Sequence, residues 1–175
     1  MFSSLICLLI INSIEVGAHF GPTSPTGSLA NNYRLTTIGS LFGQVNNLEL
    51  DYSYSKFNGK INNRDFLFLH IIGFSYQYPF LQMTNSQFTA VLGGNYNRVI
   101  RKLVSAHEAS YVLGLKYGLG FNKNFTVSEH LRPTLLSRLC LNQIIQARSW
   151  NSNQLLSSNL FISLTVGLSF RFHEK

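Results

Sequence analysis

The chain has 175 residues, which is the usual length of one domain and enough for a closed barrel of eight strands with its loops. Hydrophobic residues make up 45% of it and charged residues 12%, yet no run approaches the roughly 18 apolar residues of a membrane helix, so a helical membrane protein is excluded. The net charge of +7 comes from basic residues scattered singly, without the clustered basic face that binds nucleic-acid phosphates, so no nucleic-acid partner is expected.

The start of the chain predicts a signal-like segment followed by a first strand. Residues 5–11 form a continuous apolar run with the length of a secretory signal core, so residues 1–12 are assigned to such a segment. Val16-Gly17-Ala18 has the small residues of a cleavage site, but Ser13 to Gly21 also alternates like a strand. An up-and-down barrel closes with an even number of strands, which favours keeping this strand and assigning the barrel to residues 13–175.

Segments that alternate apolar and polar residues with a period of two follow along the whole chain, as strands require. The predicted strands are residues 13–21, 33–42, 48–57, 65–78, 87–97, 110–122, 129–145 and 159–172. The connections at one end are residues 22–32, 58–64, 98–109 and 146–158, and those at the other end are residues 43–46, 79–86 and 123–128. The pattern predicts an all-β fold, an eight-stranded antiparallel up-and-down barrel.

The strand of residues 159–172 shows most clearly which face points outward. Its even positions, from Leu160 to Phe172, are all large and apolar, while its odd positions are small or polar except for Phe161. The lumen of an eight-stranded barrel is too narrow for a row of bulky side chains from every strand, so the bulky face must point outward. An outer wall of that size needs lipid as its solvent, which favours a transmembrane barrel. A secreted lipocalin-like carrier, with its apolar residues inside, is one alternative.

Charges of both signs fall on positions that we expect to face the lumen. They are Glu15, Arg34, Glu49, Asp51, Lys116, Arg132, Arg138 and Arg171. Because charges in a narrow lumen need partners, we predict a network of ion pairs and hydrogen bonds that plugs the interior. A selective pore is the alternative reading of the same residues.

The apolar N-terminal segment, the alternating strands and the last strand L-T-V-G-L-S-F-R-F resemble the small eight-stranded outer-membrane barrels of Gram-negative bacteria. The resemblance covers residues 13–172 in pattern. It implies a structural or interaction role in the bacterial outer membrane, termini in the periplasm, and contact with outer-membrane lipid and lipopolysaccharide. It also implies that the barrel assembly machinery recognises Phe170 and Phe172, although that family's terminal aromatic is normally the last residue and three residues follow here. The oligomeric state stays open.

Some small barrels are lipid-modifying enzymes, so a hydrolytic set of residues was considered. Ser105, His107, Glu108 and Ser110 contain the residue types of a catalytic triad. Residues so close in sequence point to different sides, so no catalytic residue is assigned and a lipid-modifying enzyme stays an alternative. The two cysteines, Cys7 and Cys140, indicate neither a disulfide framework nor a metal site, and no cofactor is expected.

A basic group lies in one predicted outer loop. Arg98, Arg101 and Lys102 fall within residues 98–109, where phosphate groups of lipopolysaccharide would be close. Charge-assisted contacts between such side chains and phosphate are strong. These three residues are therefore candidate lipopolysaccharide contacts.

Overall fold

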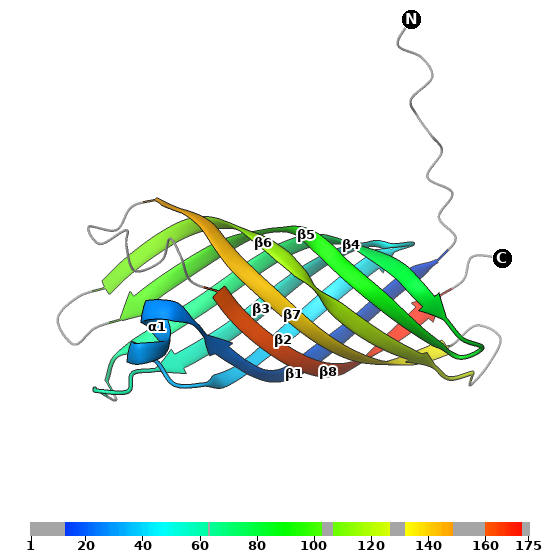
Figure 1. Cartoon of the computed structure of the whole chain (residues 1–175), viewed down its shortest axis with the longest axis horizontal. Coiled ribbons are helices and arrows are strands. Elements are labelled where there is room, and N and C mark those ends of the chain that lie inside the picture. The colour runs from blue at the N-terminus through cyan, green and yellow to red at the C-terminus, as the bar shows by residue number, and fades with distance from the viewer. Residues whose placement is uncertain (1–12, 63, 103–106, 127–131, 149–159, 173–175) are drawn as a thin grey trace, which may run out of the picture.

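A computed structural model describes residues 13–62, 64–102, 107–126, 132–148 and 160–172 (Figure 1). The elements are β1 (Ile14–Pro25), α1 (Gly27–Asn32), β2 (Thr36–Val45), β3 (Leu48–Asn58), β4 (Phe66–Gln82), β5 (Ser86–Lys102), β6 (His107–Asn124), β7 (Arg132–Arg148) and β8 (Leu160–Phe172). Every strand pairs antiparallel with its sequence neighbours, and β1 pairs with β8, so the sheet closes into a barrel. The predicted fold class is confirmed.

Five strands, most clearly β4, β5 and β6, are longer than predicted, and the connections between β4, β5 and β6 are correspondingly shorter. β4 and β5 have 17 residues each, and only residues 83–85 separate them. Residues 98–102 and 107–109, predicted as loop, belong to β5 and β6, where each finds a ladder partner on the facing strand. The predicted loop of residues 22–32 contains the end of β1 and the helix α1. Residues 1–12, the predicted signal-like segment, lie outside the described part of the chain.

The two ends of the barrel differ in their connections. At the terminal end, where β1 begins and β8 ends, a two-residue turn joins β2 to β3, and Asn46 takes the left-handed conformation there (φ 54°) that asparagine tolerates. At the distal end, α1 follows β1 at the end of the barrel (Figure 1). Its flanks are tied down because the Thr26 N–H donates to Leu160 O and the Lys60 N–H donates to Asn32 O, both at 2.8 Å.

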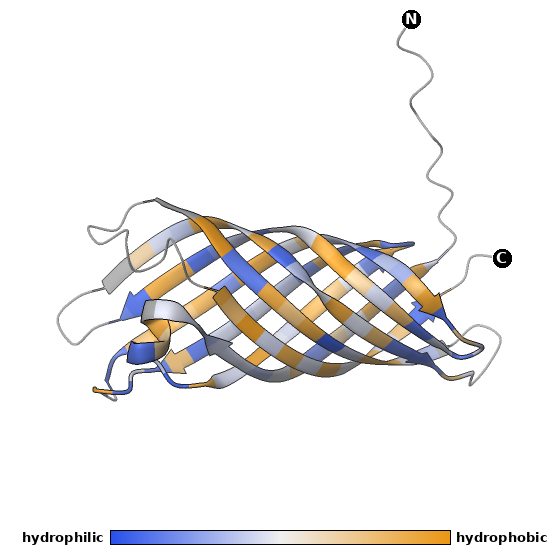
Figure 2. Ribbon diagram, viewed as in Figure 1, coloured by the Kyte–Doolittle hydropathy of each residue, from blue (hydrophilic) through white to orange (hydrophobic). Residues whose placement is uncertain are grey.

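The outer surface of the barrel is apolar. Along β8, the outward residues Ile162, Leu164, Val166 and Leu168 are between 38% and 54% exposed, while the serine and threonine residues between them are buried. Figure 2 shows hydrophobic and hydrophilic residues alternating along the strands. Such a surface needs a hydrocarbon solvent, so the transmembrane barrel holds and the lipocalin-like carrier is wrong. No helix in the described ranges is long and apolar enough to cross a membrane.

The inner surface changes from polar to apolar along the barrel. On β3, the inward residues run from Glu49 and Asp51 near the terminal end, through two serines, to Phe57 near the distal end. The buried distal residues form one cluster, called here the distal apolar layer: Leu29, Tyr33, Ile38, Phe57, Leu67, Leu69, Ile71, Val99, Val112, Ile144 and Phe161. The expectation that only small and polar residues point inward is therefore wrong for this end. The layer, with Leu29 of α1, provides an apolar core in which bulky side chains are buried.

Candidate functional site

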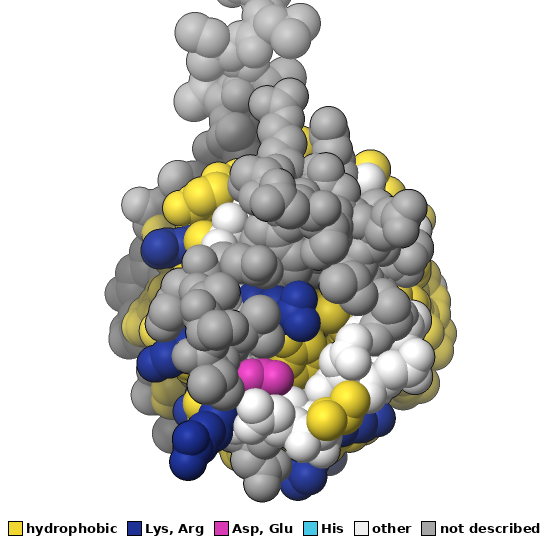
Figure 3. All heavy atoms as spheres, turned by 90° about the vertical axis from the view of Figure 1, so that its left-hand side faces the viewer, with side chains coloured by type: hydrophobic (Ala, Val, Ile, Leu, Met, Phe, Trp, Pro, Cys, Tyr) yellow, Lys and Arg dark blue, Asp and Glu magenta, His cyan; other side chains and the backbone are white. Residues whose placement is uncertain are grey.

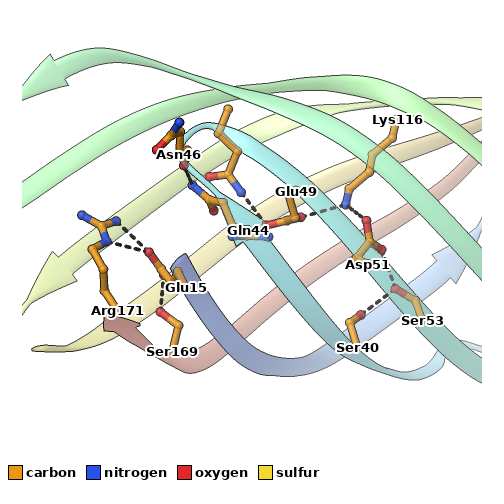
Figure 4. A network of polar contacts seen from close by, with 12 residues as sticks. Glu15, Ser40, Gln44, Asn46, Glu49, Asp51, Ser53, Lys116, Ser169 and Arg171 are labelled. Atoms are coloured by element: carbon orange, nitrogen blue, oxygen red, sulfur yellow. Dashed lines mark hydrogen bonds and ion pairs between the residues drawn. The ribbon is translucent and has the colours of Figure 1, made fainter. Parts of the chain in front are cut away.

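Four charged side chains from three strands meet inside the barrel. Lys116 Nζ on β6 lies 3.3 Å from Glu49 Oε1 and 2.5 Å from Asp51 Oδ1, both on β3 (Figure 4). Arg138 Nη1 on β7 lies 2.6 Å from Glu49 Oε2. None of these four residues, called here the lumen ion cluster, is more than 4% exposed. The two positive and two negative charges cancel, which makes their burial tolerable.

Polar neighbours satisfy the remaining carboxylate positions of the lumen ion cluster. Gln77 Nε2 donates to Glu49 Oε2 at 2.5 Å, and Ser53 Oγ donates to Asp51 Oδ2 at 3.1 Å. Ser40 Oγ lies 2.7 Å from Ser53 Oγ and extends the network to β2 (Figure 4). All four carboxylate oxygens therefore have a partner, which offsets part of the cost of burying them.

Arg138 is held by charge and by an aromatic face. Its guanidinium carbon lies 4.8 Å from the centre of the Phe42 ring, a cation–π contact. Within the described residues, the Nε and Nη2 atoms of Arg138 have no hydrogen-bond partner. The same Phe42 ring also lies next to His19, with the two ring centres 5.8 Å apart.

A second ion pair lies nearer the terminal end. Arg171 donates to Glu15 Oε2 through Nη2 at 2.7 Å and Nε at 2.9 Å, and the Ser169 hydroxyl donates to Glu15 Oε1. The Arg171 side chain is 23% exposed. It also borders a polar cavity of about 380 Å³ that is lined mainly by amide and hydroxyl side chains: Ser13, Gln44, Asn46, Asn47, Gln77, Gln87, Thr89, Asn122 and Arg171.

The structure brings six of the eight predicted lumen charges together in these two groups: Glu15, Glu49, Asp51, Lys116, Arg138 and Arg171. Arg34 was predicted to face the lumen, and this is wrong because it is exposed. α1 occupies residues 27–32 and β2 begins only at Thr36, so Arg34 lies outside the strand that was expected to turn it inward. The side chain of Arg132 lies outside the described part.

Sequence reasoning did not single out several polar residues of the lumen. Asn97 Nδ2 donates to Asn95 Oδ1 at 2.7 Å, and Asn95 Nδ2 donates to Asn142 Oδ1 at 3.0 Å, so three amides form a chain across the lumen. Gln77, which bonds Glu49, was missed as well. These amide residues could have been found from the sequence, because they lie on the polar faces of the predicted strands.

Of the residues considered for hydrolysis, Ser110 alone has a described side chain. Ser110 points into the lumen and is fully buried, while the side chains of Ser105, His107 and Glu108 lie outside the described ranges. Among the described residues, no group of His, Cys, Asp and Glu side chains could hold a metal ion.

The candidate lipopolysaccharide contacts do not form one loop cluster. Arg98, Arg101 and Lys102 lie on β5, where side chains alternate between the two faces. Arg98 and Lys102 are exposed on the outside, and Arg101 is on the inward face and half-buried. The aromatic residues Phe170 and Phe172 are exposed at the terminal end of β8.

A glycine on β4 makes room for the lumen ion cluster. A Cβ atom added to Gly73 would lie only 2.3 Å from Asp51 Oδ1, so Gly73→Ala should push the Asp51 carboxylate away from Lys116. We expect a loss of about 1–3 kcal/mol in the free energy of unfolding, the usual cost of overpacking, measured by urea titration in lipid vesicles. The control is Gly39→Ala, because Gly39 faces outward with no atom within 4 Å of an added Cβ. An equal loss in both variants would contradict this assignment.

Comparison with known proteins identifies the fold. No protein-family model and no curated protein matches the chain. Among solved structures, neisserial surface protein A (NspA) superposes with a TM-score of 0.62 at 16% identity, covering 92% of this chain and 97% of that one. Ail, the attachment invasion locus protein of Yersinia pestis, superposes with a TM-score of 0.52 at 10% identity, covering 92% and 99%. The chain therefore has the fold of the small eight-stranded outer-membrane barrels, and the predicted resemblance is confirmed at this level.

Proposed function

We propose that this protein is a closed, non-conducting barrel of the bacterial outer membrane with a structural or interaction role. The observation that carries the proposal is the filling of the lumen at two levels. The lumen ion cluster joins β3, β6 and β7 across the interior, and the buried side chains of the distal apolar layer lie beyond it. Eight strands leave an interior just wide enough for side chains, so we expect these two layers to leave no continuous water path.

Several features support the outer membrane as the location. The apolar outer wall requires a bilayer, and the chain has the fold of proteins from that membrane. Under this proposal, outer-membrane lipid and lipopolysaccharide surround the barrel. The barrel assembly machinery recognises the exposed aromatic residues Phe170 and Phe172. The terminal end, with its short turns, faces the periplasm.

The distal end is then the surface that other molecules meet. Figure 3 looks onto this end, where several Lys and Arg side chains lie around the rim and hydrophobic side chains are visible in the opening. α1 is anchored there by Lys60, whose Nζ donates to Ala30 O at 2.5 Å. An anchored, closed platform is suited to presenting a surface rather than to passing solutes.

Conductance and fractionation test this proposal directly. In planar bilayers we expect no conductance above background for the wild-type protein, with a larger porin as the control for insertion. We expect the protein to fractionate with the outer membrane and to show heat-modifiable gel migration. Stable channels would contradict the closed lumen, and recovery in the soluble fraction would contradict the location. Release of fatty acid from lipid A that is lost in His107→Ala would instead favour the enzyme.

A further inference from the structure

Cations lie on the outer surface of the barrel near its distal end. Lys56 on β3 and Arg98 and Lys102 on β5 are all exposed. The residues on either side of Lys56 and of Arg98 are buried in the lumen, so these two side chains point away from it. They therefore face the same surroundings as the apolar outer wall.

The strand register gathers these cations among aromatic side chains. Tyr54 pairs with His70, His70 pairs with Arg98, and Arg98 pairs with Tyr111, which makes one row across four neighbouring strands. In the next row toward the distal end, Lys56 pairs with Phe68, and one row further Phe66 pairs with Lys102. The basic-aromatic patch consists of Tyr52, Tyr54, Lys56, Phe66, Phe68, His70, Arg98, Lys102 and Tyr111.

Contacts within the patch hold the polar groups in place. Lys56 Nζ lies 4.2 Å from the centre of the Phe66 ring, and Arg98 Cζ lies 5.9 Å from the centre of the Tyr111 ring. These are distances at which a ring face attracts a cation. The Tyr52 hydroxyl lies 2.8 Å from His70 Nδ1, a hydrogen bond that joins β3 to β4 on the outer surface.

No protein carboxylate neutralises these cations in the described part of the chain. Every ion pair there uses Glu15, Glu49 or Asp51, and all three are in the lumen. A cation on the lipid-facing surface of a barrel costs about 2–4 kcal/mol at the bilayer midplane and about 0–1 kcal/mol near the interface. The aromatic residues around the patch are typical of that interface, where lipid phosphates lie.

We infer that the basic-aromatic patch binds the phosphate of an outer-leaflet lipid, the phosphorylated lipid A part of lipopolysaccharide. The inference rests on the outer-membrane location proposed above and assigns the binding residues. Arg98 offers a planar fork of donors, and Lys56 offers a point charge one row further from the membrane centre. Arg101 is not part of the patch, because it lies on the inward face of β5.

The test uses the folded full-length protein in detergent micelles with purified diphosphoryl lipid A as the probe. We expect the dissociation constant to rise on the order of tenfold for each of Lys56→Gln and Arg98→Gln, the effect of losing one charge-assisted hydrogen bond. Dephosphorylated lipid A and inorganic phosphate are measured in parallel, and each should bind much more weakly. Heat-modifiable migration shows that each variant is folded.

Two further variants distinguish binding at the patch from a general attraction between positive charge and lipid A. Lys123 also sits over an aromatic ring on the outer surface, 5.7 Å from the centre of Phe125, but at the terminal end, so Lys123→Gln should leave binding unchanged. Arg101→Gln should do the same. Equal losses in these controls, unchanged binding in the patch variants, or equally tight binding of inorganic phosphate would overturn the inference. If the protein fractionates with the outer membrane but does not bind lipid A, only this inference fails.

Discussion

Replacement of Glu49 with glutamine is expected to lower the free energy of unfolding by about 3–5 kcal/mol, because it leaves two buried cations with a single carboxylate between them. Glu49 is fully buried, and its oxygens contact Lys116 and Arg138. Glutamine has nearly the same shape, so the loss reports the charge and not a cavity. Urea unfolding of protein folded into lipid vesicles, followed by gel migration, measures it.

Adding a second substitution shows whether the loss of stability comes from the unbalanced charge or from damage to the fold. In the double variant Glu49→Gln and Arg138→Gln, Asp51 and Lys116 remain as a balanced pair 2.5 Å apart, so most of the lost stability should return. The matched control is Glu15→Gln, because its partner Arg171 reaches solvent; here we expect a loss of about 1 kcal/mol or less. Strictly additive losses in the double variant would show that charge balance is not the cause.

The number of strands and their outward faces could be predicted from the sequence. Lipid on one face of the sheet and a narrow lumen on the other require apolar and small or polar side chains to alternate along each strand. β8 follows that rule from Ile162 to Phe172. Phe161, the one exception within this strand, is buried in the distal apolar layer beside Phe57, with ring centres 5.7 Å apart. An exception to the alternation thus marked the point where the lumen becomes apolar.

The distal parts of the strands could not be predicted because the alternation is inverted there. On β5, Arg98 points outward and Val99 points inward, which is the opposite of the rule that holds nearer the terminal end. Residues 98–109 carry a basic group where an apolar outer face was expected, so they were predicted as a loop. Tyr33, at the start of a predicted strand, instead lies in the distal apolar layer, to which α1 contributes Leu29.

Which inward charges form ion pairs depends on their height along the barrel axis. The alternation of apolar and polar residues gives only the face of the sheet and not that height. Period two places Glu49 and Lys116 on the inner face, but β3 and β6 are not neighbouring strands. Their 3.3 Å contact follows from the stagger of strands around the closed barrel. Six of the eight predicted charges could be placed in the lumen, whereas their pairing required the register.

Replacement of Phe57 with alanine is expected to lower the free energy of unfolding by about 3–5 kcal/mol, because the ring is fully buried in the distal apolar layer and its removal leaves a cavity. The same urea titration measures it. The matched control is Phe74→Ala on β4, where the side chain is 56% exposed on the outer wall. Lipid tails are as apolar as the side chain and fill the vacated space, so this loss should be about 1 kcal/mol or less.

Conductance of Phe57→Ala then tests whether the lumen is closed at two independent levels. We expect this variant to remain non-conducting, because the lumen ion cluster still blocks the interior on the terminal side of the cavity. Channels in Phe57→Ala but not in the wild type would show that the distal apolar layer alone seals the barrel. Equal losses of stability in Phe57→Ala and Phe74→Ala would show that the inward phenylalanine is not packed in a core.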